Sequence, residues 1–150
     1  MFRSRSDVAA LALSLAIAFA CEGVPGASGA QPTATWSQTL ATQLASQLAS
    51  GMTGLYDTAI KEPAFAGERS EYGETLQNLR VLSEESRALK AELESGKTYE
   101  ETLHRYENIK EVARDTQESE SWTFLPADFT AKADGAFAVL KQLDAYYGAR

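Results

Sequence analysis

The residues with the most evident chemical potential surround the single histidine. His104 follows Glu100 and Glu101 by one turn of a helix and precedes Glu107 by one turn, with Glu111 one turn further on. On a helix these spacings place the imidazole and the carboxylates on one surface. A metal site needs three or four converging ligands, and a lone histidine among glutamates seldom provides them. We interpret the group as a solvated acidic face and expect no metal site.

Haem is the cofactor that small helical bundles of this size often hold. The chain has one cysteine and no C-x-x-C-H attachment motif, so a covalent site is excluded. Met52 and His104 are residue types that ligate haem iron together. However, Met52 continues a row of leucines, so we interpret it as a core residue. The sequence predicts no cofactor.

Catalytic motifs are absent from the sequence. It has no G-x-S-x-G elbow for a nucleophilic serine and no glycine-rich loop for a phosphate. The carboxylate pairs Glu84–Glu85 and Glu100–Glu101 fall on polar helix faces, whereas acid–base catalysis needs a shielded carboxyl with a shifted pKa. We therefore expect a protein that is not an enzyme.

Four segments repeat apolar residues at helical spacing, and none shows the sustained alternation of a strand. The first, residues 35–61, has one apolar stripe with steps of mostly four, formed by Trp36, Leu40, Leu44, Leu48, Met52, Leu55 and Ile60. The second covers 70–94, the third begins at Thr98 and ends before the polar stretch 116–121, and the fourth covers 126–147. The sequence therefore predicts an all-α protein.

Several residues mark where these helices begin and end. Thr98 and Glu101 have the spacing of a capping box, and Gly96 suits the left-handed position after a helix. Pro63 stops the first helix, and Pro126 suits a first helical position because it lacks an amide hydrogen. The connection at Gly96 is so short that the second and third helices should be antiparallel neighbours.

Four amphipathic helices can hide their stripes by packing around a shared interior. Short connections favour an up-down-up-down four-helix bundle, which is the predicted fold. The alternative is an elongated hairpin of the second and third helices with a separate N-terminal helix that pairs with another chain.

The N-terminus has the pattern of a secretory signal peptide. Arg3 and Arg5 precede an apolar run, VAALALSLAIAFA at 8–20, which is too short to span a bilayer. Small residues place the cut after Ala30, with a cut after Ala20 as the alternative. We therefore divide the chain into a leader, residues 1–30, and one helical domain, residues 31–150. The predicted location is outside the cytoplasm, periplasmic or secreted, with no transmembrane anchor after processing.

Cys21 directly follows the apolar run, which raises the alternative of a lipoprotein anchored through an acylated cysteine. Bulky Phe19 before the cut argues against that alternative, so we favour a cysteine that is discarded with the leader. As the only cysteine, it excludes an intramolecular disulfide.

The charge balance narrows the choice of partners. The net charge is −7, and removal of the leader leaves it unchanged, because the leader holds two basic and two acidic residues. An acidic chain repels phosphate backbones, so nucleic acid is excluded as a partner. It also avoids anionic lipid surfaces unless it is anchored.

Two features could provide contact with a protein partner or self-association. No charge occurs from residue 23 to residue 56, although surface helices of an acidic protein usually carry charge. Burial of this helix by its own bundle on most sides also explains the pattern, and we favour that interpretation over a partner surface. Trp36, Trp122, Phe124 and Leu125 are aromatic and apolar residues that could contact a partner, although for 122–125 we favour the interpretation that they fold back and plug the end of the bundle. The sequence predicts a small exported helical bundle that binds protein or assembles with itself. The alternative function is a periplasmic carrier or sensor for a small ligand or metal.

Overall fold

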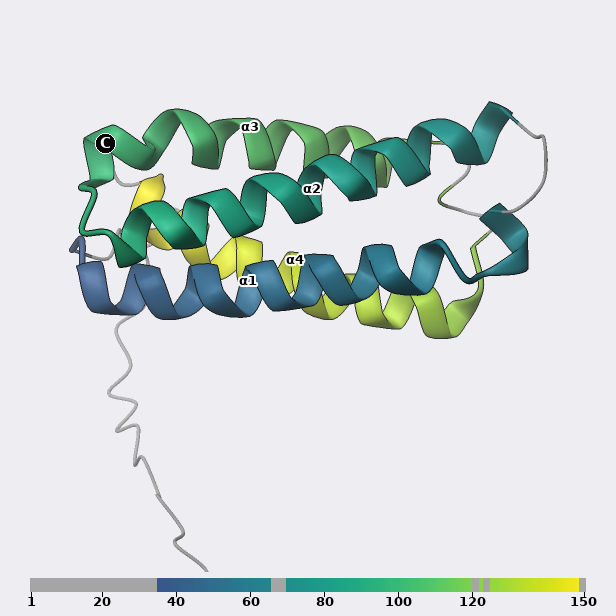
Figure 1. Ribbon diagram of the computed structural model, residues 1–150, viewed down its shortest axis with the longest axis horizontal. Coiled ribbons are helices and arrows are strands. Elements are labelled where there is room, and N and C mark those ends of the chain that lie inside the picture. Colours follow the sequence, from purple (N-terminus) through teal and green to yellow (C-terminus); the bar gives the residue numbers. More distant parts are fainter. Residues whose placement is uncertain (1–34, 66–69, 120–121, 123–124, 149–150) are drawn as a thin grey trace, which may run out of the picture. The chain divides into compact units, whose positions relative to one another are not determined.

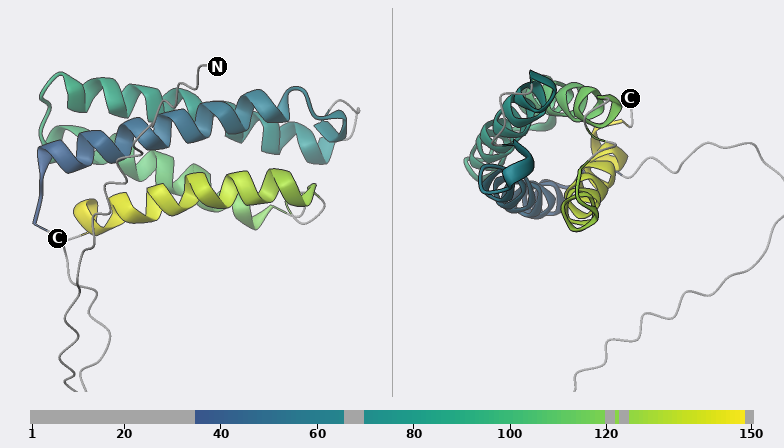
Figure 2. Two further views of the ribbon diagram at one scale, coloured as in Figure 1. Left: turned by 90° about the horizontal axis from the view of Figure 1, so that it is seen from below. Right: turned by 90° about the vertical axis from the view of Figure 1, so that its right-hand side faces the viewer.

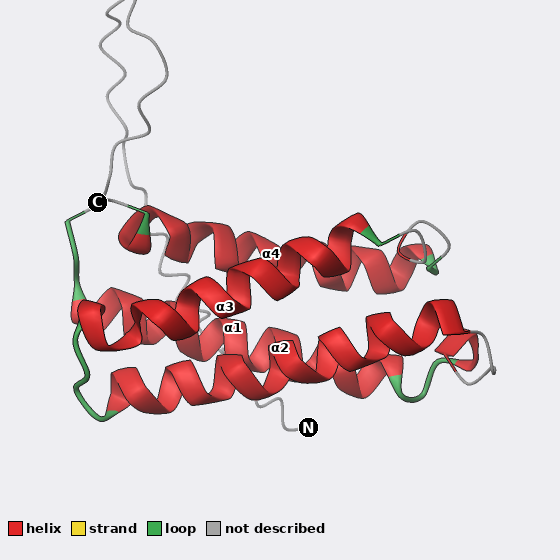
Figure 3. Cartoon of the chain, turned by 90° about the horizontal axis from the view of Figure 1, so that it is seen from above, coloured by secondary structure: helices red, strands yellow, loops and turns green. Residues whose placement is uncertain are grey.

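The computed structural model describes residues 35–65, 70–119, 122 and 125–148. These residues form helices α1 (Gln38–Ala59), α2 (Ser70–Glu94), α3 (Tyr99–Glu118) and α4 (Ala127–Tyr147), with a short 3-10 helix η1 (Pro63–Phe65) after α1. No strand occurs within these ranges (Figure 3). The predicted all-helical class is confirmed for this part of the chain, whereas the predicted leader, residues 1–30, lies outside it.

The four helices lie lengthwise side by side, and consecutive helices run in opposite directions (Figure 1). Helix α1 packs against α2 and α4, and α3 also packs against α2 and α4. The end-on view shows the resulting ring of four helices (Figure 2). Because α1 has two neighbours within the chain, this arrangement fits the predicted bundle better than a hairpin with a separate first helix. No helix in the described ranges is both long enough and apolar enough to cross a bilayer.

The core is built from the inward face of each helix. Its large, fully buried side chains include Leu48, Met52 and Leu55 of α1, Leu79, Leu82, Leu89 and Leu93 of α2, Ile109 of α3, and Phe129 and Leu143 of α4. Burial of a large apolar side chain contributes about 1.5–3 kcal/mol, so this face of each helix carries most of the stability. Met52 is completely buried and fills the core, as its row of leucines predicts.

The predicted apolar stripe of the first helix is only partly correct. Leu40 and Ile60 are 45% and 52% exposed, and the fully buried positions near the start of α1 are Ala41 and Ala45. A step of four residues advances about 40° past a full turn of a helix, so a stripe built from such steps winds away from the core. Its first and last members therefore leave the interior, and small alanines occupy the inward positions.

Small residues bring α1 and α4 close together. A Cβ atom placed on Gly51 would lie 3.2 Å from the Cβ atom of Ala136, which is tighter than ordinary packing. Glycine at position 51 therefore permits the approach of the two helices at this level.

The local signals at the helix ends are mostly confirmed. The Glu101 carboxylate accepts a hydrogen bond from the Thr98 amide at 2.8 Å, and the predicted capping box is present. Gly96 has a φ of 88°, the left-handed conformation predicted for it. Pro126 is the residue before α4 rather than its first residue, because its ψ of 143° is extended, and its carbonyl accepts from the Phe129 and Thr130 amides.

Candidate functional site

One end of the bundle holds a cluster of aromatic rings with hydrogen-bonded hydroxyls, which we call the tyrosine end: Trp36, Tyr99, Thr102, Tyr106 and Tyr147. The Trp36 ring meets the rings of Tyr99 and Tyr147 edge-on, with centroids 5.3 and 5.1 Å away, and the Tyr106 and Tyr147 rings stack at 4.2 Å. Of the predicted partner-binding residues, Trp36 therefore lies against its own bundle, where it is partly buried.

The hydroxyls of the tyrosine end bond within the bundle. Tyr99 donates to the Tyr147 carbonyl at 3.0 Å, and the Tyr147 hydroxyl lies 2.7 Å from that of Thr102. Tyr106 donates to Asp144 at 2.9 Å, and Lys110 donates to the same carboxylate oxygen at 2.6 Å. These bonds join α3 to α4.

Asp144, Tyr106 and Tyr147 titrate away from their ordinary ranges. The ion-paired hydrogen bond from Lys110 lowers the pKa of Asp144, and the Tyr106 hydroxyl adds to this effect. Burial is the main cause that raises the pKa of both Tyr106 and Tyr147. Both tyrosines therefore stay protonated at physiological pH, and Tyr106 remains the hydrogen-bond donor to Asp144.

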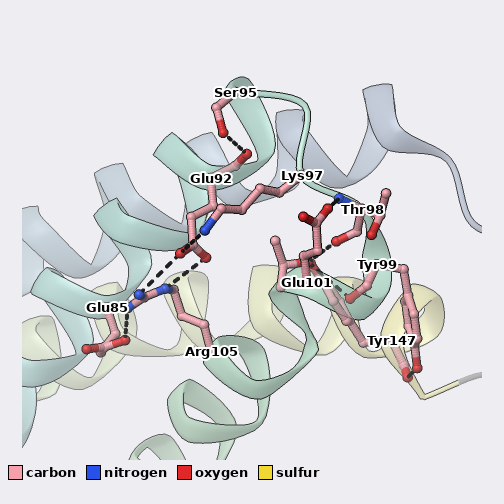
Figure 4. A network of polar contacts seen from close by, with 10 residues as sticks. Glu85, Glu92, Ser95, Lys97, Thr98, Tyr99, Glu101, Arg105 and Tyr147 are labelled. Atoms are coloured by element: carbon pink, nitrogen blue, oxygen red, sulfur yellow. Dashed lines mark hydrogen bonds and ion pairs between the residues drawn. The ribbon is translucent and has the colours of Figure 1, made fainter.

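A network of charged side chains joins α2 to α3 beside this end (Figure 4). Arg105 of α3 lies between two carboxylates of α2, Glu85 and Glu92, with Nε 3.0 Å from Glu92. Lys97 also binds Glu92, at 2.9 Å. The hydrogen bond from Arg105 is the main cause that lowers the pKa of Glu92. Because every charge in the network has a partner, we assign it a structural role.

The opposite end of the bundle holds a second aromatic cluster, which we call the phenylalanine end: Phe65, Tyr72, Trp122, Leu125, Phe129 and Phe137. The Trp122 ring meets Phe129 and Phe137 edge-on, with centroids 6.2 and 5.7 Å away. Leu125 is 8% exposed. The structure therefore directs Trp122 and Leu125 toward the bundle, whereas Phe124, the remaining predicted partner-binding residue, lies outside the described residues.

A surface without charge runs along the seam between α1 and α4. We call it the uncharged face, and it bounds a hollow of about 420 Å³ lined by Leu40, Gln43, Leu44, Gln47, Gln142, Ala145 and Tyr146. Leu40 is 45% exposed there, and Gln43, Gln47 and Gln142 are exposed. The sequence predicted the α1 part of this face from the missing charges between residues 23 and 56.

The contribution of α4 to this face was missed, although the sequence holds a signal for it. Between residues 133 and 147 the charged residues are Asp134, Lys141 and Asp144, spaced seven and three apart. Such spacing gathers them on one stripe of the helix, and all three line the side that faces α3. Over this stretch, the side of α4 toward α1 is consequently uncharged.

A groove opens between α3 and α4, which pack less closely than the other neighbouring pairs of helices. It has a volume of about 480 Å³, and its lining includes Tyr106, Lys110, Ala113, Arg114, Phe137, Ala138, Leu140, Lys141 and Asp144. Nothing in the sequence analysis predicted this groove. The small side chains of Ala113 on α3 and Ala138 on α4 are part of its lining.

The acidic group around His104 stays on the surface. His104, Glu100, Glu101 and Glu107 are exposed on α3. Within the ranges that the structure describes, no three His, Cys, Asp or Glu side chains lie close enough together to hold a metal ion. Glu101 is engaged by the backbone of Thr98, and that hydrogen bond lowers its pKa.

Comparison with known proteins adds no relative. No protein-family model, no curated protein and no solved structure matches the chain.

Proposed function

We propose that this protein is exported, has no catalytic activity, and acts by association with protein through the uncharged face. The partner that this face fits best is a second copy of the same chain. The observation that carries the proposal is the exposed, charge-free surface of Leu40, Gln43 and Gln47 on α1, continued by Gln142 and Tyr146 on α4.

Electrostatics favours this face over the rest of the surface for self-association. Two chains with a net charge of −7 repel each other, and charged patches of one sign cannot complement themselves. A two-fold contact requires a patch that is complementary to itself. Glutamine amides both donate and accept hydrogen bonds, so Gln43, Gln47 and Gln142 meet this requirement around the apolar side chains of Leu40 and Tyr146.

The proposed lack of catalysis is supported by the causes of the shifted pKa values. Glu92, Arg105 and Asp144 are shifted mainly by hydrogen bonds between helices, and Tyr106 and Tyr147 by burial in the aromatic cluster. Pairing between helices and burial in the core are therefore sufficient causes of these shifts, and no catalytic acid or base is needed to account for them.

Export is supported by the leader-like sequence of residues 1–30 alone. The test is the intact mass of the protein recovered from the cell envelope and from the medium. A mass equal to that of residues 31–150 supports the proposal. A mass equal to that of residues 21–150 plus a lipid on Cys21 supports the anchored alternative. Recovery of the full chain from the cytosol contradicts export.

Self-association is tested by light scattering and native mass spectrometry of the purified protein. We expect a dimer at micromolar concentration, and we expect Gln47→Glu and Leu40→Glu to shift it toward monomer by placing like charges opposite each other. The matched control is Gln77→Glu, an exposed glutamine in the first half of α2. A monomer at every concentration contradicts the proposal, as does a dimer that neither substitution weakens.

A further inference from the structure

The groove between α3 and α4 has the size and floor of a ligand site. Its volume of about 480 Å³ lies within the usual range for small-molecule pockets, roughly 300–1,000 Å³. The floor is formed by Tyr106, Ala113, Phe137 and Leu140, which present apolar atoms. A second hollow of about 370 Å³ continues toward the end of α4 and shares Tyr106, Lys110 and Asp144 with the first.

The levels of the charged residues along the groove can be derived from the Lys110–Asp144 ion pair and the rise per residue of a helix. The Lys110–Asp144 ion pair, at 2.6 Å, places these two residues at the same level of the antiparallel helices. At 1.5 Å per residue, Arg114 lies about 6 Å further along α3, and Lys141 about 4.5 Å further in the same direction on α4. The two cations Arg114 and Lys141 therefore face each other across the groove at nearly the same level.

The carboxylates that line the groove do not neutralise these two cations. Asp144 is bound by Lys110 and Tyr106. Glu118 and Asp134 lie about 12 and 15 Å from the level of the Lys110–Asp144 pair, toward the opposite end of the groove. Glu107 lines only the second hollow, on the other side of that pair.

The two cations differ in their partners from Lys110, the third cation of the groove, which pairs with a lining carboxylate. Arg114 pairs with Asp115 and Glu111, which are exposed residues outside the groove lining. Lys141 has no hydrogen bond or ion pair with any residue that the structure describes. A pair of like charges above an apolar floor is complementary to an anion that carries an apolar tail.

We propose that this groove binds a single-chain fatty carboxylate. The carboxylate group lies between Arg114 and Lys141, and the alkyl chain lies over Leu140 and Phe137 and beside Ala138, on the side away from the Lys110–Asp144 ion pair. This site is separate from the uncharged face and does not depend on self-association. It would give the protein the second function considered from the sequence, carriage of a small ligand.

The test is calorimetric titration of the purified protein with dodecanoate, kept below the concentration at which it forms micelles. We expect saturable binding, and much weaker binding of dodecylammonium, because Arg114 and Lys141 flank the position of the charged group. Lack of binding by dodecanoate overturns the proposal. Equal binding of the two amphiphiles also overturns it, because a merely apolar surface would not distinguish them.

Matched substitutions on α4 locate the site. Ala138→Leu fills the groove and should abolish binding, whereas Ala131→Leu, at an exposed alanine outside the lining, should not. Lys141→Glu should weaken binding by about tenfold or more, whereas Lys132→Glu should have little effect. Circular dichroism checks that each variant is folded. Because Lys141 and Lys132 are both exposed, their comparison stays decisive if Ala138→Leu unfolds. Equal effects of Lys141→Glu and Lys132→Glu overturn the proposed position.

Discussion

The two ends of the bundle close the same kind of core in different ways. The tyrosine end combines ring packing with hydroxyl hydrogen bonds, such as Tyr99 to the Tyr147 carbonyl and Tyr106 to Asp144. The phenylalanine end packs the rings of Phe65, Trp122 and Phe129, and its stability must come mainly from burial. Burial is non-directional, whereas hydrogen bonds fix geometry. Both ends are therefore stabilised by ring burial, and the tyrosine end has directed hydrogen bonds in addition. Substitutions can separate the two contributions.

The largest effect is expected at the phenylalanine end. Phe129 is 1% exposed and touches Phe65 and Trp122, so Phe129→Ala should destabilise the protein by about 3–5 kcal/mol through the lost burial and the cavity. Chemical denaturation measures the change. Ile60→Ala is the control, because Ile60 is 52% exposed and its loss should have little effect. Similar losses for both would show that Phe129 is not a core residue.

Substitution of Trp122 tests whether this side chain closes the end of the bundle or binds a partner protein. The Trp122 ring packs edge-on against Phe129 and Phe137, so Trp122→Ala should cost about 2–3 kcal/mol and lower the melting temperature. Thermal melts and light scattering are measured on the same sample. Unchanged stability together with lost association would instead support the alternative that this residue contacts a partner.

A smaller effect is expected when one hydroxyl is removed from the tyrosine end. Tyr147→Phe keeps the ring but loses the 2.7 Å contact with Thr102, which should cost about 1 kcal/mol. Tyr56→Phe is the control, because Tyr56 is a partly buried tyrosine of α1 whose hydroxyl has no hydrogen bond among the described residues. Denaturation curves that coincide for the two variants would contradict a directed role for the Tyr147 hydroxyl.

The smallest effect is expected at Asp144, and it should depend on pH. The hydrogen bond from Lys110 holds the pKa of Asp144 below its ordinary value of 3.8 in the folded protein. The folded state therefore gains stability above that ordinary value and loses it as the pH falls through the lowered pKa. Because Asp144 is partly exposed, Asp144→Asn should cost only about 0.5–1 kcal/mol at neutral pH.

Acid denaturation curves check this prediction. The difference in stability between Asp144→Asn and the unchanged protein should shrink as the solution is acidified. Asp134→Asn, an exposed carboxylate on the same helix, should show no comparable loss at neutral pH. A difference that stays constant down to strongly acidic pH would contradict the ion pair with Lys110.

The features predicted from the sequence are those determined by neighbouring residues. The capping box of Thr98 and Glu101 and the left-handed Gly96 depend on a few adjacent positions, and both are present. The exposure of Leu40 was not predicted. Periodicity shows that a helix has an apolar side, but not which residues of that side the neighbouring helices cover. The shape of Leu40's surroundings depends on α4, which begins far along the chain.

The candidate sites show the same limit. The charge-free stretch of α1 predicted a contact surface, whereas its completion by Gln142 and Tyr146 required the position of α4. The groove required knowing that Arg114 and Lys141 stand on opposite walls. The predicted partner-binding residues Trp36 and Trp122 lie against the aromatic clusters, and their role in binding stays a prediction.

The contact of Gly51 with Ala136 limits how α1 and α4 can slide along each other. A shift of α4 by one turn would bring Lys132 or Leu140 to the position where only a methyl group now fits. Either side chain would force the two backbones apart and open the core beneath them. The absence of a side chain at Gly51 thus fixes the axial register of α1 against α4. Registers shifted by one turn in either direction are disfavoured.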